Sequence, residues 1–132
     1  MVLIDSNILL DIWQNDPQWS TLSTEALRRL AAAEELAINP IIFAEVSVRF
    51  PSRVDVDRAL GSLSITLLNI PNEAAFLAGK AFQQYRKQGG TKTGVLPDFF
   101  IGAHAEALGC TLLTRDGSRY ANYFPIIRLI HP

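Results

Sequence analysis

The stretch Val2-Leu3-Ile4-Asp5-Ser6-Asn7 decides the fold. Its three apolar residues, two of them β-branched, predict a short buried strand. Asp5 follows at the point where that strand must end. Sites in parallel α/β sheets form beyond the carboxyl ends of the strands, so Asp5 would stand at the functional edge of a sheet. Its carboxylate has two possible roles there. It could cap a helix over Asn7 to Trp13, or it could be the first member of an acidic site.

The composition indicates one ordinary globular domain. The chain has 132 residues, of which 48% are hydrophobic, and residues 1–132 can form a single buried core. The formal net charge of −1 excludes a bulk polyanion binder, so any contact with nucleic acid would need a local basic patch. The apolar runs are too short to span a membrane, there is no signal-peptide pattern, and Cys110 has no disulfide partner. We therefore expect a cytoplasmic protein.

Strands and helices are predicted to alternate along the whole chain. Beyond the first strand, strands are expected at 36–38, 65–68, 111–113 and 126–129. Helices are expected at 7–13, from 20 or 23 to 34, and at 40–50, 53–60, 72–88 and 98–108. Parallel neighbours need crossover helices, so this order predicts a three-layer α/β/α domain with a mostly parallel sheet of four to five strands.

Capping residues support several of these bounds. Ser20 or Ser23 can cap the second helix, and Ser52 can cap a later one. Asn39-Pro40 is typical of an N-cap followed by proline in the first helical position. Gly109 is a suitable C-terminal stop for the helix that starts at Asp98.

Four carboxylates stand in positions that call for more than solvation. Asp5 and Asp116 follow predicted strands, Asp98 opens a helix, and Glu45 lies on an apolar helix face. Each also has an ordinary explanation: Asp98 suits a helix start, Asp116-Gly117 suits a turn, and Glu45 could reach solvent or pair with Arg49. Taken together, however, they can converge on one cleft at the sheet edge.

A gathering of carboxylates without a cation would be electrostatically unfavourable, because each would raise the pKa of its neighbours. A divalent ion removes that conflict. Oxygen ligands without cysteine or histidine favour Mg²⁺ or Mn²⁺ over zinc. Asp11, about a turn and a half beyond Asp5, could be solvated or support the ligands from behind.

Other chemistries fit the residues less well. An aspartyl phosphatase would need Asp-x-Asp, and Asn7 occupies the second of those positions. There is no glycine-rich phosphate loop. His104 and His131 have no serine or cysteine partner in a recognisable motif, and we expect His104 to be structural or exposed.

Four segments together resemble the PIN-domain proteins, and most closely the VapC-type toxins of prokaryotic toxin–antitoxin pairs. They are Ile4 to Asp11, Pro40 to Glu45, Pro97 to Ala105, and Leu113 to Asp116 with Tyr120 and Phe124-Pro125. Each motif is short, but the order and spacing of all four are specific, and the likeness covers essentially the whole chain.

The resemblance implies a metal-dependent endoribonuclease that uses Mg²⁺ or Mn²⁺. The acidic quartet of the family carries over to Asp5, Glu45, Asp98 and Asp116, with Asn7 and Thr114 as polar support. One or two metal ions held there would orient a water molecule and offset charge on the scissile phosphate. All four acidic positions are filled, so the resemblance implies an active enzyme that cleaves RNA, with tRNA or rRNA as the expected class.

Partners follow from the same likeness: an RNA substrate, a VapB-like antitoxin that covers the acidic groove, and a second copy in a homodimer. Arg86, Lys87 and Lys92 form the best candidate patch for RNA, although cations at a helix C-terminus also interact with its dipole. Trp13, Trp19 and Leu22 could make partner contacts or belong to the core. The alternative function is a non-catalytic RNA- or protein-binding module with the same fold.

Overall fold

The computed structural model describes all residues from Met1 to Pro132. Its centre is a sheet of five strands in the order β3-β2-β1-β4-β5, and every neighbouring pair is parallel. The first strand of the chain therefore occupies the middle of the sheet. The strands are β1 (Val2–Ile4), β2 (Leu36–Ile38), β3 (Ile65–Leu67), β4 (Thr111–Leu113) and β5 (Leu129–Ile130). The predicted parallel sheet is confirmed, with five strands.

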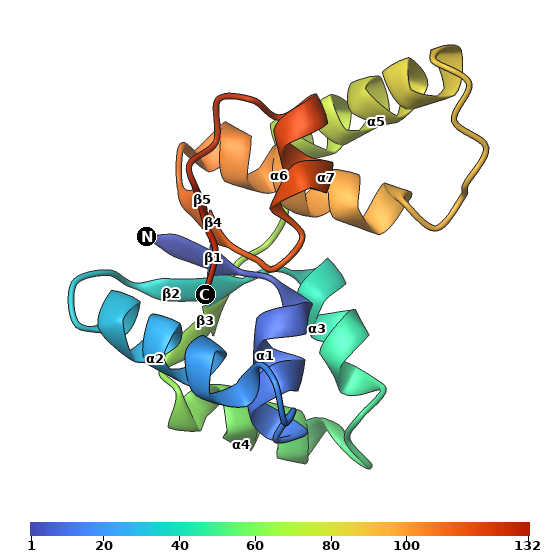
Figure 1. Cartoon of the computed structure of the whole chain (residues 1–132). Helices are drawn as coiled ribbons and strands as arrows, with labels where there is room; N and C mark the ends of the chain where they lie inside the picture. The colour runs from blue at the N-terminus through green and yellow to red at the C-terminus, as the bar shows by residue number, and fades with distance from the viewer.

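Helices cover both faces of the sheet, which gives the predicted three layers (Figure 1). Helices α1 to α4 lie on one side, and α5, α6 and α7 lie on the other. Their bounds are α1 (Ser6–Trp13), α2 (Ser20–Ala31), α3 (Pro40–Ser47), α4 (Arg53–Ser62), α5 (Asn72–Lys87), α6 (Leu96–Leu108) and α7 (Gly117–Tyr123). None of these helices combines the length and apolar character that crossing a bilayer requires.

Near the end of the chain one predicted bound is wrong and one helix is missing from the prediction. The last strand starts at Leu129 rather than at residue 126, because the Ile127 amide donates to the Phe124 carbonyl and closes a turn. Pairing with β4 begins only where the Leu112 amide donates to the Arg128 carbonyl, at 2.9 Å. Helix α7 was not predicted, since Asp116-Gly117 is typical of a turn. Its buried Tyr120 shows that tertiary packing stabilises this short helix.

Helix termini agree with the capping predictions at α3 and α4 and disagree at α2. Asn39 caps α3 by accepting from the Ile42 amide at 3.0 Å, and Ser52 caps α4 by accepting from the Asp55 amide at 3.3 Å. No side chain caps α2, so neither Ser20 nor Ser23 has the predicted role. Asp16 instead accepts from backbone amides in the turn before α2. Helix α3 also ends at residue 47, three before the predicted stop, in a tighter turn.

Helix α3 is anchored from α6 through a buried pair. The His104 ring is fully buried, with Nδ1 at 3.2 Å from Asn39 Nδ2, and Asn39 is the cap of α3. Burial lowers the pKa of His104, so the neutral ring is favoured. The structural role that was expected for His104 is confirmed, and its effect is to fix the helix that carries Glu45.

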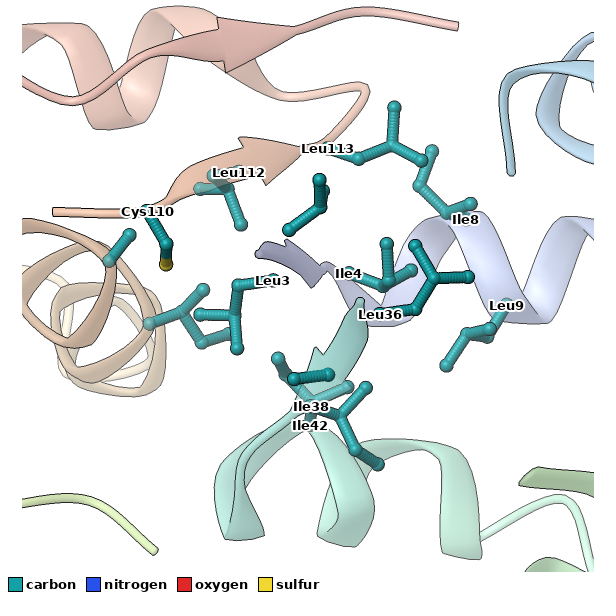
Figure 2. Packing of buried hydrophobic residues seen from close by; sticks show 14 of the residues in the cluster. Leu3, Ile4, Ile8, Leu9, Leu36, Ile38, Ile42, Cys110, Leu112 and Leu113 are labelled. Carbon is teal, nitrogen blue, oxygen red and sulfur yellow. The ribbon is translucent and has the colours of Figure 1, made fainter. Parts of the chain in front are cut away.

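The core packs around β1 and its neighbours. Leu3, Ile4, Ile38 and Leu112 are fully buried. In Figure 2, Ile4 lies on the side of Ile8 and Leu9 from α1, and Ile38 lies beside Ile42 from α3. Leu3 points to the other side of the sheet, where Cys110 lies. Cys110 belongs to this cluster as a buried free thiol. A well-packed sheet of this kind holds the carboxyl end of β1 in a fixed position.

A glycine in α6 is required by this packing, which gives a first prediction. A Cβ built on Gly102 would lie 2.4 Å from the buried Phe124 ring, whereas one on the exposed Gly79 of α5 would meet nothing within 4 Å. We expect Gly102→Ala to lower the free energy of unfolding by about 1–3 kcal/mol, as overpacking does. Gly79→Ala should instead raise it by up to about 1 kcal/mol, through helix propensity. Urea unfolding of both variants measures the two effects, and equal shifts would contradict the packing argument.

Candidate active site

Asp5 caps α1 and stands at the carboxyl end of β1, where it was expected. It lies at the end of β1 with 4% of its surface exposed. Its Oδ1 accepts from the Ser6 amide at 2.7 Å and so caps α1. Its Oδ2 accepts from the Thr114 hydroxyl at 2.7 Å and from the Tyr120 hydroxyl at 3.0 Å. The carboxylate is therefore oriented by three donors from β1's own end and from the far end of the chain.

Burial controls the ionisation of Asp5. Loss of solvent raises its pKa above the ordinary value, and the nearby Asp98 carboxylate raises it further. The hydrogen bonds from Thr114 and Tyr120 act in the opposite direction without reversing the shift. A carboxylate held like this carries a charge that the protein alone does not fully compensate.

Asp98 lies in the first turn of α6 and faces Asp5 across the Tyr120 hydroxyl. Its side chain is 15% exposed, and its Oδ1 is 3.4 Å from the hydroxyl that also binds Asp5. A phenol has one proton to donate, so Tyr120 can serve only one of the two carboxylates at a time. The other oxygen of Asp98 pairs with the Arg119 guanidinium, and this pairing raises the pKa of Arg119.

Glu45 brings a third carboxylate to the same region from α3. Its Oε1 is buried and has no hydrogen-bond partner. Loss of solvent raises its pKa, Asp5 and Asp98 add to the increase, and the Ser6 hydroxyl partly offsets it. No ion pair with Arg49 forms, so that explanation of Glu45 is wrong. An unsatisfied carboxylate oxygen beside two other carboxylates is costly unless a ligand completes it.

Asp116 stands at the rim of the site and is exposed. Its Oδ2 accepts from Asn7 Nδ2 at 3.4 Å, and its amide donates to the Thr114 hydroxyl at 3.0 Å. Asn7 Oδ1 also accepts from the Arg115 amide at 3.3 Å. Asn7 and Thr114 thus tie the turn after β4 to the start of α1, which agrees with the supporting positions expected of them.

Asp11 is buried behind this turn and is not solvated. The Arg115 guanidinium donates to both of its oxygens, at 2.9 and 2.8 Å, and the Ser23 hydroxyl donates at 2.8 Å. The same guanidinium lies 5.0 Å from the centre of the Trp19 ring. This cluster joins α1, the segment before α2, α2 and the turn after β4. Asp11 therefore supports the site from behind.

The three cations predicted to contact RNA lie in different surroundings in the structure. Arg86 stacks its guanidinium over Phe82 at 5.1 Å, and Lys87 is exposed at the end of α5. Lys92 lines a cavity together with Arg119.

The three residues predicted either to contact a partner or to belong to the core differ in their exposure. Trp13 and Trp19 are half-buried, while Leu22 is 46% exposed and does not join the apolar face of α2.

The acidic residues meet at one edge without forming a finished metal site. Asp5, Glu45 and Asp98 are electrostatic neighbours, and Asp116 is connected to them through Asn7 and Thr114. No group of three or more acidic, histidine or cysteine side chains is arranged to hold an ion. The donor set still fits a hard divalent cation, because all its ligands are oxygens and one buried oxygen of Glu45 lacks any partner.

The sequence did not predict three contacts at the site. They are Arg115 with Asp11, Arg119 with Asp98, and Tyr120 with Asp5. Tyr120 was noticed only as part of a motif. A helix predicted over residues 117–123 would have placed Arg119 and Tyr120 near the carboxyl ends of the strands. Asp116-Gly117 concealed that helix, because the pair is typical of turns.

The chain is similar in sequence to a known protein family. The sequence model of the family described as PIN domain matches residues 2–123. The chain belongs to the PIN domain family. The resemblance to PIN-domain proteins and the fold class predicted from the alternation of strands and helices are both confirmed. A comparison with curated protein sequences finds no match.

Solved structures show the same PIN fold over nearly the full chain. A toxin–antitoxin complex from Klebsiella pneumoniae matches with TM-score 0.72 and 26% identity, covering 98% of this chain and 96% of that one. VapBC2 from Rickettsia felis, bound to a DNA fragment from its promoter, matches with TM-score 0.75 and 19% identity, covering 99% and 98%. VapC20 from Mycobacterium tuberculosis, described as a toxin that cleaves the sarcin–ricin loop, matches with TM-score 0.63 and 15% identity, covering 97% and 99%.

Proposed function

We propose that this PIN domain is a metal-dependent endoribonuclease and the toxin of a VapBC-type pair. One observation carries the catalytic part: Asp5 and Asp98 share the Tyr120 hydroxyl, with an unpaired oxygen of Glu45 buried in the same region. Carboxylates with raised pKa values that lack a matching cation are suited to binding one. The structural likeness to chains of toxin–antitoxin complexes supports the biological role.

Asp5, Glu45, Asp98 and Asp116 would hold Mg²⁺ or Mn²⁺. The bound ion would supply Lewis-acid stabilisation of the scissile phosphate and activation of a water molecule. Thr114 and Ser6 fix the orientation of Asp5 by donating to its two oxygens. Tyr120 keeps its proton, since burial and the adjacent carboxylates raise its pKa, so it remains a hydrogen-bond donor within reach of both Asp5 and Asp98.

The partners in this proposal are an RNA substrate of the tRNA or rRNA class, a VapB-like antitoxin, and a second copy in a homodimer, in the cytoplasm. The net charge of −1 means that RNA must be held by local cations. Arg119 and Lys92 are candidate cations for this role, since Arg119 pairs with Asp98 and Lys92 shares a cavity with Arg119.

Incubation of the full chain with total RNA tests the activity. We expect cleavage with Mn²⁺ or Mg²⁺ and none with EDTA. Isothermal titration with Mn²⁺ tests metal binding independently of cleavage. RNA binding without any metal-dependent cleavage would favour the alternative, a non-catalytic binding module.

The Arg119–Asp98 pair gives a prediction for metal affinity. The guanidinium occupies an oxygen that the ion would use, so Arg119→Gln should tighten Mn²⁺ binding to the RNA-free protein. The side chain of Arg119 is 47% exposed, and the pair is therefore worth no more than about 1 kcal/mol, or roughly fivefold in affinity. Mn²⁺ titration of the variant measures this change.

Arg53→Gln is the matched control, because it breaks an exposed pair with Asp57 on α4. Its Mn²⁺ affinity should equal that of the wild type. Equal Mn²⁺ affinities of Arg119→Gln and Arg53→Gln would show that Arg119 does not compete for the site.

A further inference from the structure

A cavity of about 450 Å³ adjoins the acidic edge, and its walls do not belong to the carboxylate site. It lies between the end of α5, the α5–α6 connection, the start of α6 and α7. Arg119 connects the two regions, because it lines the cavity and pairs with Asp98. The volume lies within the range of about 300–1,000 Å³ that small ligands occupy in proteins.

One wall of the cavity is aromatic and rigid. The centre of the Tyr123 ring lies 5.0 Å from that of Phe99, and the Tyr85 and Phe99 centres are 5.8 Å apart. Hydrogen bonds hold the outer rings: the Tyr123 hydroxyl donates to Gln88 Oε1 at 3.2 Å, and the Tyr85 hydroxyl accepts from the Lys92 amide at 2.9 Å. Both tyrosines are half-buried. A wall built of aromatic rings can pack against a nucleobase.

The other wall is cationic and polar. Lys92 and Arg119 contribute two positive charges, Ser118 and Asn122 contribute exposed hydroxyl and amide groups, and no acidic residue lines the cavity. None of the four ion pairs of the structure involves Lys92. In a chain with more acidic than basic residues, this combination selects for a ligand with both an aromatic face and a negative charge.

We propose that this cavity binds one nucleotide of the RNA strand next to the scissile phosphate. The base packs against Tyr123 and Tyr85, and the phosphate lies near Lys92 and Arg119. Because Arg119 lines the cavity and also pairs with Asp98, a nucleotide held here would bring an adjacent phosphate toward the acidic edge. This inference rests on the proposed function for its substrate, and it assigns a particular place on the protein to that substrate.

Binding of a short single-stranded RNA to the full chain in EDTA tests the cavity without any cleavage. Lys92→Ala should weaken binding about fivefold and reduce the salt dependence by about 0.7 in log–log slope, the loss of one phosphate contact. Lys80→Ala is the matched control. It removes the same charge from α5, where Lys80 lies over the exposed Phe76 and away from the cavity. Its affinity should stay at the wild-type value.

Three further variants protect the test against misfolding and against a purely electrostatic effect. Asn122→Asp adds a negative charge at an exposed lining residue with almost no change of shape, and it should weaken binding at least as much as Lys92→Ala. Gln83→Glu makes the same change on exposed α5 surface outside the cavity and should have little effect. Tyr123→Leu should cost roughly tenfold through lost stacking, worth about 1–3 kcal/mol per base.

Amide and ring resonances provide a direct readout, since added nucleoside monophosphate should shift signals of Tyr123, Tyr85 and Lys92. Undetectable RNA binding in EDTA, or equal affinities of Lys92→Ala and Lys80→Ala, would overturn the cavity proposal even if the wild type cuts RNA. Cavity-dependent RNA binding without any Mn²⁺-dependent cleavage would confirm the cavity and refute the nuclease.

Discussion

Asp5→Asn is expected to reduce RNA cleavage about 100-fold or more while the domain stays folded. The substitution keeps the shape of the side chain and removes the charge that would bind the ion. Losses of this size are typical when one electrostatic group is removed from a catalytic site. Asn retains an oxygen for the Ser6 amide, so the cap of α1 can persist. The rate of cleavage with Mn²⁺ measures the effect, with Asp57→Asn on the exposed face of α4 as the matched control.

The same substitution should stabilise the metal-free protein, and the sign follows from the pKa of Asp5. Burial raises that pKa, so the folded state holds the proton more tightly than the unfolded chain does. The contribution of Asp5 to stability is then greatest below the unfolded value of about 3.9 and is lost as pH rises through the raised pKa. At pH 7 the ionised carboxylate destabilises the fold, and Asn removes that charge. The Thr114 and Tyr120 hydroxyls, which donate to Oδ2 of Asp5, must then turn to accept from the Asn amide group.

Thermal unfolding in EDTA at pH 7 and at pH 4 separates these effects. Asp5→Asn should melt at or above the wild-type temperature at pH 7, with a smaller difference at pH 4. Added Mn²⁺ should raise the melting temperature of the wild type only, since a ligand stabilises the state that binds it. A variant that cuts RNA at the wild-type rate would remove Asp5 from the mechanism.

Asp11→Ala is expected to lower the free energy of unfolding by about 3 kcal/mol. Asp11 is buried, and its removal leaves the Arg115 guanidinium and the Ser23 hydroxyl without their acceptor. The expected loss lies at the lower end of the range for broken buried ion pairs, because the side chain of Arg115 is 29% exposed. Chemical denaturation measures it.

Arg53→Ala provides the contrast for Asp11→Ala. Its pair with Asp57 has nitrogen and oxygen 3.4 Å apart, and the two side chains are 83% and 53% exposed. Such a pair contributes less than about 1 kcal/mol. If the two variants lost equal stability, the Asp11 cluster would not be the structural support that its geometry indicates. A variant at Asp11 should also slow cleavage, since Arg115 belongs to the turn that presents Thr114 and Asp116.

The sheet could be predicted because its strands are local sequence patterns. Short apolar runs ended by polar residues indicated four of the five strands within a residue, and capping residues located α3 and α4. The last strand and α7 could not be placed in this way. Their positions depend on Phe124 and Tyr120 packing into a core that only the assembled chain provides.

The candidate site, too, could be predicted only where its residues follow a local sequence pattern. The positions of Asp5, Glu45 and Asp98 follow from strand ends and helix faces, so a sequence pattern can indicate them. The contacts of Arg119 with Asp98 and of Arg115 with Asp11 join residues 21 and 104 positions apart. Nothing local signals such pairs. The lack of an ion pair at Glu45 could not be predicted either, because Arg49 lies close in sequence and still does not pair with it.

The central position of β1 has a consequence for the order of events on the ribosome. The first strand to be made pairs with β2, and its other edge stays open until Thr111 to Leu113 have been translated. At about 5–20 residues per second, the residues between these strands take several seconds to appear. The donors to Asp5 from Thr114 and Tyr120 arrive later still. The acidic edge therefore cannot assemble until Tyr120, 115 residues after Asp5, has been translated.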